Sequence, residues 1–208
     1  ERMARALLLV LLWVIQVAAV AVFTSSTWLQ EQIAQEKMGV QAYLGEETAH
    51  HISTKADDSF RRMFVDTEVV SHVYRFLIPD DSVPKHGTEG LAPWFFEWLD
   101  DSLRTFWFVA YQAIYRLLLF SEWMPYLGIL ILAAVIDGLV ERKIRKKNRG
   151  YANPVRYRAG IRLLIILFVV PLLYLTLPIS VTPLLVPAWI FAAGAVLMLV
   201  TANAQHRI

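Results

Sequence analysis

The chain carries five long apolar runs, which lie at residues 6–23, 103–120, 124–140, 161–177 and 184–201. A helix that crosses a membrane needs about 20 predominantly apolar residues, so each run is long enough to be considered as a span. The run at 103–120 differs from the others because it also holds Arg104, Thr105, Gln112 and Arg116. These four side chains fall within an arc of about 120° on a helix, which is typical of an amphipathic helix in the membrane interface or packed on other helices.

Positive charge is concentrated between residues 142 and 162, where there are nine Lys or Arg and no Asp or Glu. Basic loops close to a span resist translocation and stay in the cytoplasm. If the run at 103–120 crossed the membrane, this loop would lie outside, so its charge favours an interfacial helix at 103–120. A signal-peptide core is the alternative for 6–23, but no clear small-x-small cleavage site follows it, and we expect a retained span.

Since 57% of the residues are hydrophobic, the composition also indicates a membrane protein. We therefore expect an all-α integral membrane protein with four transmembrane helices, one amphipathic interfacial helix and a small helical extracytoplasmic domain. Its predicted parts are a first transmembrane helix (1–25), an acidic helical periplasmic domain (26–102), the interfacial helix (103–120), a second transmembrane helix (121–141), a basic cytoplasmic loop (142–160), and the third and fourth transmembrane helices with a short cytoplasmic tail (161–208).

The polar part at 26–102 holds 14 acidic and 6 basic residues, a balance that fits the translocated side. Helical periodicity predicts one helix from about residue 27 to residue 50, with direct continuation of the first span into it left open. A second helix is predicted to start at Thr54 and to stop near Ile78. We expect interfacial anchoring by the aromatic residues Trp28, Trp94, Phe95, Phe96, Trp98 and Trp107.

Catalytic chemistry is sparse in this sequence. It has no cysteine and no phosphate-binding glycine loop, and the adjacent His50 and His51 diverge by about 100° on a helix, which makes them poor joint ligands. We expect no enzyme activity, no catalytic residue, no metal site and no cofactor. Asp137 has two interpretations, pairing with nearby cations or a neighbouring helix, and a proton or ion relay.

The basic loop is predicted to serve as a topology determinant and an anionic-lipid or partner contact, and direct contact with DNA is left open. The residues assigned to it are Asp137, Glu141, Arg142, Lys143, Arg145, Lys146, Lys147, Arg149, Arg156, Arg158 and Arg162. A patch of small residues in the last span permits close helix packing and leaves self-association open. It consists of Ala192, Ala193, Gly194 and Ala195.

One pattern of segments and motifs extends over most of the chain. A span ends in Asp137-Gly138-Leu139-Val140, a basic stretch and Tyr157 follow, and the last two spans are separated by Leu177-Pro178-Ile179-Ser180-Val181. This order, after one N-terminal span and an acidic external domain, resembles the inner-membrane proteins of integrating conjugative elements and conjugative plasmids. These are four-span proteins encoded beside the coupling ATPase, and the recognisable part of the likeness is residues 137–201.

The resemblance implies a non-enzymatic accessory of conjugative DNA transfer, or type IV secretion, with the coupling ATPase as its partner. It implies the bacterial inner membrane, and the charge pattern adds that both termini are cytoplasmic and residues 26–102 periplasmic. Two alternatives from other classes stay open. One is a sensor or regulator with a periplasmic input domain, and the other is a small transporter that uses Asp137.

Overall fold

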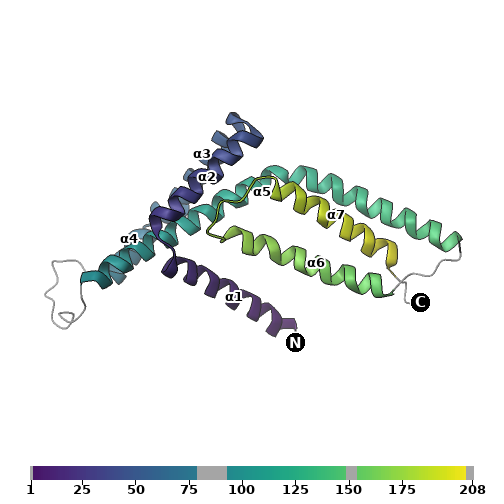
Figure 1. Ribbon diagram of the computed structural model, residues 1–208, viewed down its shortest axis with the longest axis horizontal. Coiled ribbons are helices and arrows are strands. Elements are labelled where there is room, and N and C mark those ends of the chain that lie inside the picture. The colour runs from purple at the N-terminus through teal and green to yellow at the C-terminus, as the bar shows by residue number, and fades with distance from the viewer. Residues whose placement is uncertain (1, 79–92, 149–153, 205–208) are drawn as a thin grey trace. The chain divides into compact units, whose positions relative to one another are not determined.

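The computed structural model describes residues 2–78, 93–148 and 154–204, and these residues form helices and connecting turns without any strand (Figure 1). The elements in chain order are α1 (Arg2–Phe23), α2 (Ser26–Leu44), α3 (Glu46–Phe60), the π-helix η1 (Arg61–Val65), α4 (Val69–Leu77), α5 (Pro93–Lys147), α6 (Pro154–Leu175) and α7 (Leu185–Asn203). The predicted all-α class is confirmed for this part of the chain.

Three of these helices are long and apolar enough to cross a membrane, within Trp94–Ile144, Pro154–Leu175 and Leu185–Asn203. A fourth is added if α1 and α2 together count as one bent span. These positions are compatible with an integral membrane protein. The predicted number of four spans and their orientation stay predictions.

The chain divides into two compact units. Unit 1 consists of Glu1–Leu118 and Leu175–Thr182, and unit 2 consists of Leu119–Tyr174 and Pro183–Ile208. Helix α5 contributes residues to both units. The predicted interfacial helix at 103–120 and the second predicted span at 121–141 both lie within this one helix, which includes Pro125.

The first predicted span does not continue directly into the next helix. Helix α1 ends at Phe23, Thr24 and Ser25 follow, and the chain bends by 112° before α2 begins. The helix predicted from 27 to 50 also ends early, at Leu44. Gly45 follows with φ +88°, a left-handed conformation that glycine adopts without steric cost and that stops a helix.

The second predicted helix starts earlier than expected and is interrupted. Helix α3 begins at Glu46, with Glu46 and Glu47 placing negative charge in its first turn, so Thr54 lies inside the helix. The Thr54 hydroxyl donates to the carbonyl of His50 (2.9 Å) and does not cap a helix. The chain then passes through η1 and a turn into α4, which ends at Leu77 and confirms the predicted stop near Ile78.

The apolar core of unit 1 lies where α1, α2 and α5 meet. Val20, Leu29, Ile33 and Val109 form one buried cluster. Helix α2 lies along α3, and the first part of α5 runs beside this pair (Figure 1). In unit 2, α7 lies alongside the remaining part of α5, and α6 lies next to α7 (Figure 1).

Candidate functional site

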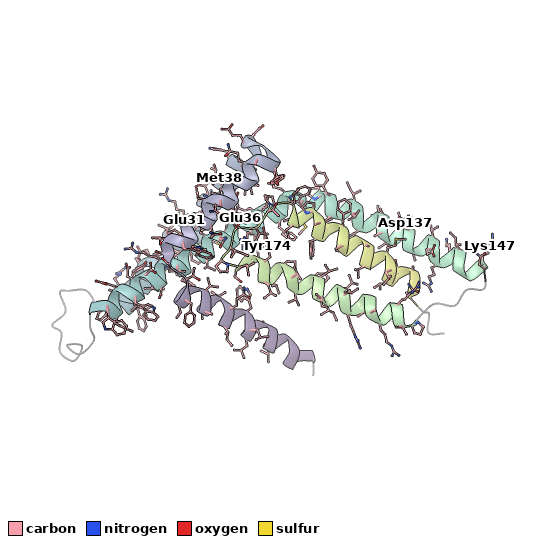
Figure 2. The ribbon with its side chains drawn as sticks, viewed as in Figure 1. Glu31, Glu36, Met38, Asp137, Lys147 and Tyr174 are labelled. Atoms are coloured by element: carbon pink, nitrogen blue, oxygen red, sulfur yellow. The ribbon has the colours of Figure 1, made fainter. Side chains whose placement is uncertain are left out.

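A buried ion pair lies at the centre of unit 1. Arg116 of α5 and Glu36 of α2 have side chains 0% and 1% exposed. Arg116 Nε donates to Glu36 Oε1 (2.8 Å) and Nη2 donates to Glu36 Oε2 (2.6 Å), which is the two-point geometry that a guanidinium makes with a carboxylate. Gln112, one turn before Arg116, donates from Nε2 to Glu36 Oε2 (3.0 Å). Glu36 can be located on α2 in Figure 2.

The same arginine holds the connector that follows α6. Arg116 Nη1 donates to the carbonyl of Leu177 (2.8 Å), and Nη2 donates to the carbonyl of Ile179 (2.7 Å). The backbone N–H of Ser180 then donates to Gln32 Oε1 on α2 (3.0 Å). Gln32 and Glu36 are four residues apart and share one face of α2. This polar lock, as we call Glu36, Gln112, Arg116 and their contacts, ties α2, α5 and the connector together.

The bend between α1 and α2 is held by a second polar contact. Asp101 of α5 accepts hydrogen bonds from the backbone N–H of Ser26 (3.4 Å) and from its hydroxyl. Ser26 is the first residue of α2, where free N–H groups and the helix dipole favour a carboxylate. Thr105 also donates to the carbonyl of Thr24 in the bend (3.1 Å). The Asp101 side chain of α5 therefore caps the N-terminus of α2, because Ser25 at the N-cap position makes no side-chain capping hydrogen bond.

The sequence singled out part of this arrangement. Thr105, Gln112 and Arg116 of the predicted polar arc are buried against protein, whereas Arg104 is exposed and pairs with Asp100 (2.9 Å). Packing on other helices was one of the two arrangements expected for this arc. Sequence reasoning missed Glu36, and the signal that could have identified it is a carboxylate on the same face of a predicted helix as Leu29, Ile33 and Val40.

Glycines bring the helices of unit 2 into close contact. A Cβ atom at Gly138 of α5 would lie 2.9 Å from the carbonyl oxygen of Met198 and would overlap the side chain of Thr201, both on α7. A Cβ at Gly160 of α6 would lie 2.6 Å from Val200 Cγ2, and one at Gly194 of α7 would lie 2.9 Å from Leu130 Cδ2. Within the predicted small-residue patch, Gly194 is buried, Ala193 is half-buried, and Ala192 and Ala195 are exposed.

The residues predicted for the basic loop lie at the end of α5 and the start of α6. Asp137, Lys143 and Lys147 on α5 are exposed, and Glu141 and Arg142 are half-buried. Figure 2 labels Asp137 and Lys147 along the last part of α5. Arg156, Arg158 and Arg162 on α6 are exposed. Arg145 and Lys146 belong to α5, and Arg149 lies outside the described residues.

The aromatic residues predicted as interfacial anchors have different environments. Trp28, Trp94 and Trp98 are exposed, and Phe95 and Phe96 are half-buried. Trp107 is buried in unit 1, where its ring lies 5.6 Å from that of Phe64 between centroids. Trp107 is therefore covered by protein rather than open to lipid headgroups.

No group of three His, Asp or Glu that could hold a metal ion occurs in residues 2–78, 93–148 and 154–204. His50, His51 and His72 lie in α3 and α4, and His86 is outside the described residues. The polar chemistry of the described chain therefore centres on the polar lock of unit 1 and the basic end of unit 2.

Residues 23–206 match the family model described as DtrJ-like, IncC plasmid conjugative DNA transfer protein DtrJ-like. The matched range includes every element from α2 to α7. No curated protein and no solved structure matches the chain.

Proposed function

The chain belongs to the DtrJ-like family of conjugative DNA transfer proteins, and from this membership we propose that it is a non-enzymatic inner-membrane accessory of the type IV secretion machine. In this proposal it associates with the coupling ATPase through its membrane helices and its basic cytoplasmic loop. The observation that carries the proposal is the family match over residues 23–206, which makes the chain a component of conjugative DNA transfer.

The arrangement of unit 2 supports the proposed docking region. The end of α5, the start of α6 and the end of α7 lie at one end of this unit (Figure 1), and the contacts of Thr201 with Gly138 and of Val200 with Gly160 join the three helices there. Exposed cations on α5 and α6 are gathered at this end. A cytoplasmic partner with an acidic surface, or anionic lipid headgroups around that partner, would be attracted to it.

The arrangement of unit 1 supports a structural role for its buried charges. Arg116 makes hydrogen bonds to Glu36 and to two backbone carbonyls, and Gln112 shares the same carboxylate. Donors and acceptors that satisfy one another in this way fix helix positions. We therefore assign the polar lock to assembly of the fold rather than to a reaction.

The test is co-purification of the coupling ATPase with the tagged chain, in a neutral detergent, from a strain carrying the complete transfer system. A triple variant, R156Q/R158Q/R162Q, removes three exposed positive charges from the start of α6. Its matched control, R61Q/R62Q/R75Q, removes three exposed charges from η1 and α4. We expect the α6 variant to lose at least about ten-fold in co-purified ATPase, or 1.4 kcal/mol, and the control to retain it.

Conjugation frequency in a deletion strain complemented with each variant is measured in parallel. The proposal predicts a loss of transfer with the α6 variant and normal transfer with the control. If the ATPase does not co-purify and transfer is normal in the deletion strain, the proposed role is wrong. Equal losses of co-purified ATPase with both triple variants would indicate a general effect of charge and contradict specific docking at the start of α6.

A further inference from the structure

The four predicted spans, at residues 6–23, 124–140, 161–177 and 184–201, contain only two charged residues, one acid and one base. Asp137 lies in α5 (Figure 2) and Arg162 in α6, and both side chains are exposed on unit 2. In the part of the chain that the structure describes, no ion pair or hydrogen bond joins either side chain to a partner. Charged side chains inside a membrane usually pair with one another, so this surface presents an acid and a base that both need partners.

Contacts with α7 place these two charges at nearly the same level along the helices. A Cβ atom at Gly138 of α5 or at Gly160 of α6 would meet α7 within residues 198–201, so the two glycines are level with each other. Helix α5 runs parallel to α7 and α6 runs antiparallel to it (Figure 1). Asp137 is one position before Gly138, a displacement of about 1.5 Å along the axis. Arg162 is two positions after Gly160 and, because α6 is antiparallel, is displaced by about 3 Å toward the same end.

Within one chain, the two charged side chains point away from their common neighbour. Helices α5 and α6 both contact α7 through Gly138 and Gly160. Arg162 lies about 200° round α6 from Gly160, so its side chain points away from α7. Asp137 lies about 100° round α5 from Gly138. A pair between this acid and this base therefore requires a second copy of the chain.

Each charge adjoins an exposed apolar surface on its own helix. The apolar side chains lie three to eight positions from the charge, toward the middle of the span, and are Ile129 and Ala133 on α5 and Ile165 and Ile166 on α6. We call Ile129, Ala133 and Asp137 the acidic face of α5, and Arg162, Ile165 and Ile166 the basic face of α6. Helices in membranes associate through close packing and interhelical polar contacts, and small residues such as Ala133 permit close approach. The two faces therefore complement each other in charge and in packing.

We propose that copies of this chain associate side by side in the membrane, with the acidic face of α5 on one copy packed against the basic face of α6 on the next. Asp137 then pairs with Arg162 of the partner subunit at a common level in the membrane. The two faces belong to different helices, so the contact is heterologous, and it forms a ring where the rotation closes and an open row where it does not. This inference goes beyond the proposed function, because it concerns the chain with itself and does not involve the coupling ATPase.

The experiment co-expresses two copies of the full chain with different affinity tags, in a strain without a transfer system. The membranes are dissolved in a neutral maltoside detergent, one tag is captured, and the second tag is quantified. D137N in both copies removes the acid and keeps every cation, and should reduce recovery of the second tag at least about five-fold. E97Q removes another exposed acid from α5 and should leave recovery unchanged.

Exchange of the two charges separates pairing from damage to the fold. D137K in both copies brings two cations together at the contact, and R162E in both copies brings two acids together. Like charges repel, so each variant alone should lose self-association. When a D137K copy is expressed with an R162E copy, every contact again joins an acid to a base. Recovery of the second tag should then return to within about two-fold of the original pair.

Disulfide cross-linking in intact membranes tests the contact without changing a charge. The chain has no cysteine, so one copy can carry A133C on α5 and the other I165C on α6. L132C lies at nearly the same level and about 100° round α5 from Ala133, which makes it the matched control. Oxidation with copper phenanthroline should cross-link A133C to I165C at least about five times more than L132C to I165C.

Three outcomes would overturn the proposal. They are unchanged recovery in D137N and D137K, failure of the D137K and R162E copies to restore recovery, and equal cross-linking of A133C and L132C. No transfer system is present in these cells, so self-association is measured apart from co-purification of the coupling ATPase. Failure of one proposal therefore leaves the other intact.

Discussion

Arg116 is a fully buried charge whose stabilisation depends on one carboxylate and two carbonyls. Removing one member of a buried ion pair leaves the other charge without compensation and costs about 3–5 kcal/mol. R116M should therefore destabilise unit 1 by an amount in this range. Exposed ion pairs contribute less than about 1 kcal/mol, so R104M, which breaks the Arg104–Asp100 pair on the same helix, is the matched control.

The measurement for this pair is thermal unfolding of the purified protein in detergent, followed by intrinsic tryptophan fluorescence. The double variant E36M/R116M removes both buried charges and should recover part of the lost stability, since an apolar pair needs no compensation. Equal shifts in R116M and R104M would show that the polar lock contributes no more than a surface pair.

Individual residues show which parts of the polar lock and of the helix ends could be predicted from the sequence. The spacing of Thr105, Gln112 and Arg116 follows from helix geometry, so their common face was predictable. Their partner Glu36 lies 80 positions before Arg116, and local periodicity carries no information on such pairing. Gly45 ends α2 through a left-handed conformation inside an otherwise helical pattern, and Glu68 adopts a conformation that its residue type disfavours.

At the scale of elements, Pro171 lies inside α6. Proline has no backbone N–H, so the carbonyl of Leu167 loses its usual helical donor. The Trp189 indole N–H of α7 donates to that carbonyl (2.8 Å). The position of the proline in the sequence shows which carbonyl lacks a helical donor, whereas the side chain that hydrogen-bonds to this carbonyl comes from another helix.

This contact gives a double-mutant prediction. W189F leaves the Leu167 carbonyl without a donor and should cost about 1–3 kcal/mol. P171A restores a backbone N–H at the position that normally binds this carbonyl, so W189F should cost less in the P171A background. Thermal unfolding of the four proteins in detergent measures the coupling. Additive effects of the two substitutions would show that the indole does not replace the missing helical donor.

Helix contact within unit 2 gives a second prediction at this scale. G138A would place a methyl group against Thr201 and the carbonyl of Met198, so α5 and α7 would have to separate. G128A on the same helix has no neighbouring atom within 4 Å and should be neutral or slightly stabilising, because alanine favours helix by about 1 kcal/mol. Overpacking costs about 1–3 kcal/mol, and thermal unfolding of both variants decides between these outcomes. A G138A protein as stable as G128A would contradict this packing.

At the scale of the whole molecule, family membership identifies the biological process, whereas charge alone does not identify the partner. The DtrJ-like match over residues 23–206 makes conjugative DNA transfer the process in which the chain takes part. The quoted motifs at 137–140 and 177–181 were sufficient to predict that process from the sequence. The partner stays a proposal, because a basic helix end attracts several kinds of anionic surface and charge alone does not distinguish among them.

The orientation of the chain is the last prediction, and it rests on opposite charge at two segments. Residues 26–102 hold 14 acidic and 6 basic residues, whereas residues 142–162 hold nine basic and no acidic residues. Basic segments beside spans stay in the cytoplasm, so these two segments should lie on opposite sides of the membrane. The chain has no cysteine, which permits single-cysteine variants in an otherwise unlabelled protein.

We choose D58C in α3 and K147C at the end of α5, because both positions are exposed. A membrane-impermeant maleimide applied to intact spheroplasts should label D58C and leave K147C unlabelled. After permeabilisation both should be labelled, which controls for accessibility.

External labelling of K147C would place the basic loop outside. The interfacial assignment of residues 103–120 would then fail, because an additional crossing before the loop would be required. Labelling of D58C alone instead leaves an odd number of crossings between residues 58 and 147. The candidate span within Trp94–Ile144, counted once, gives that number.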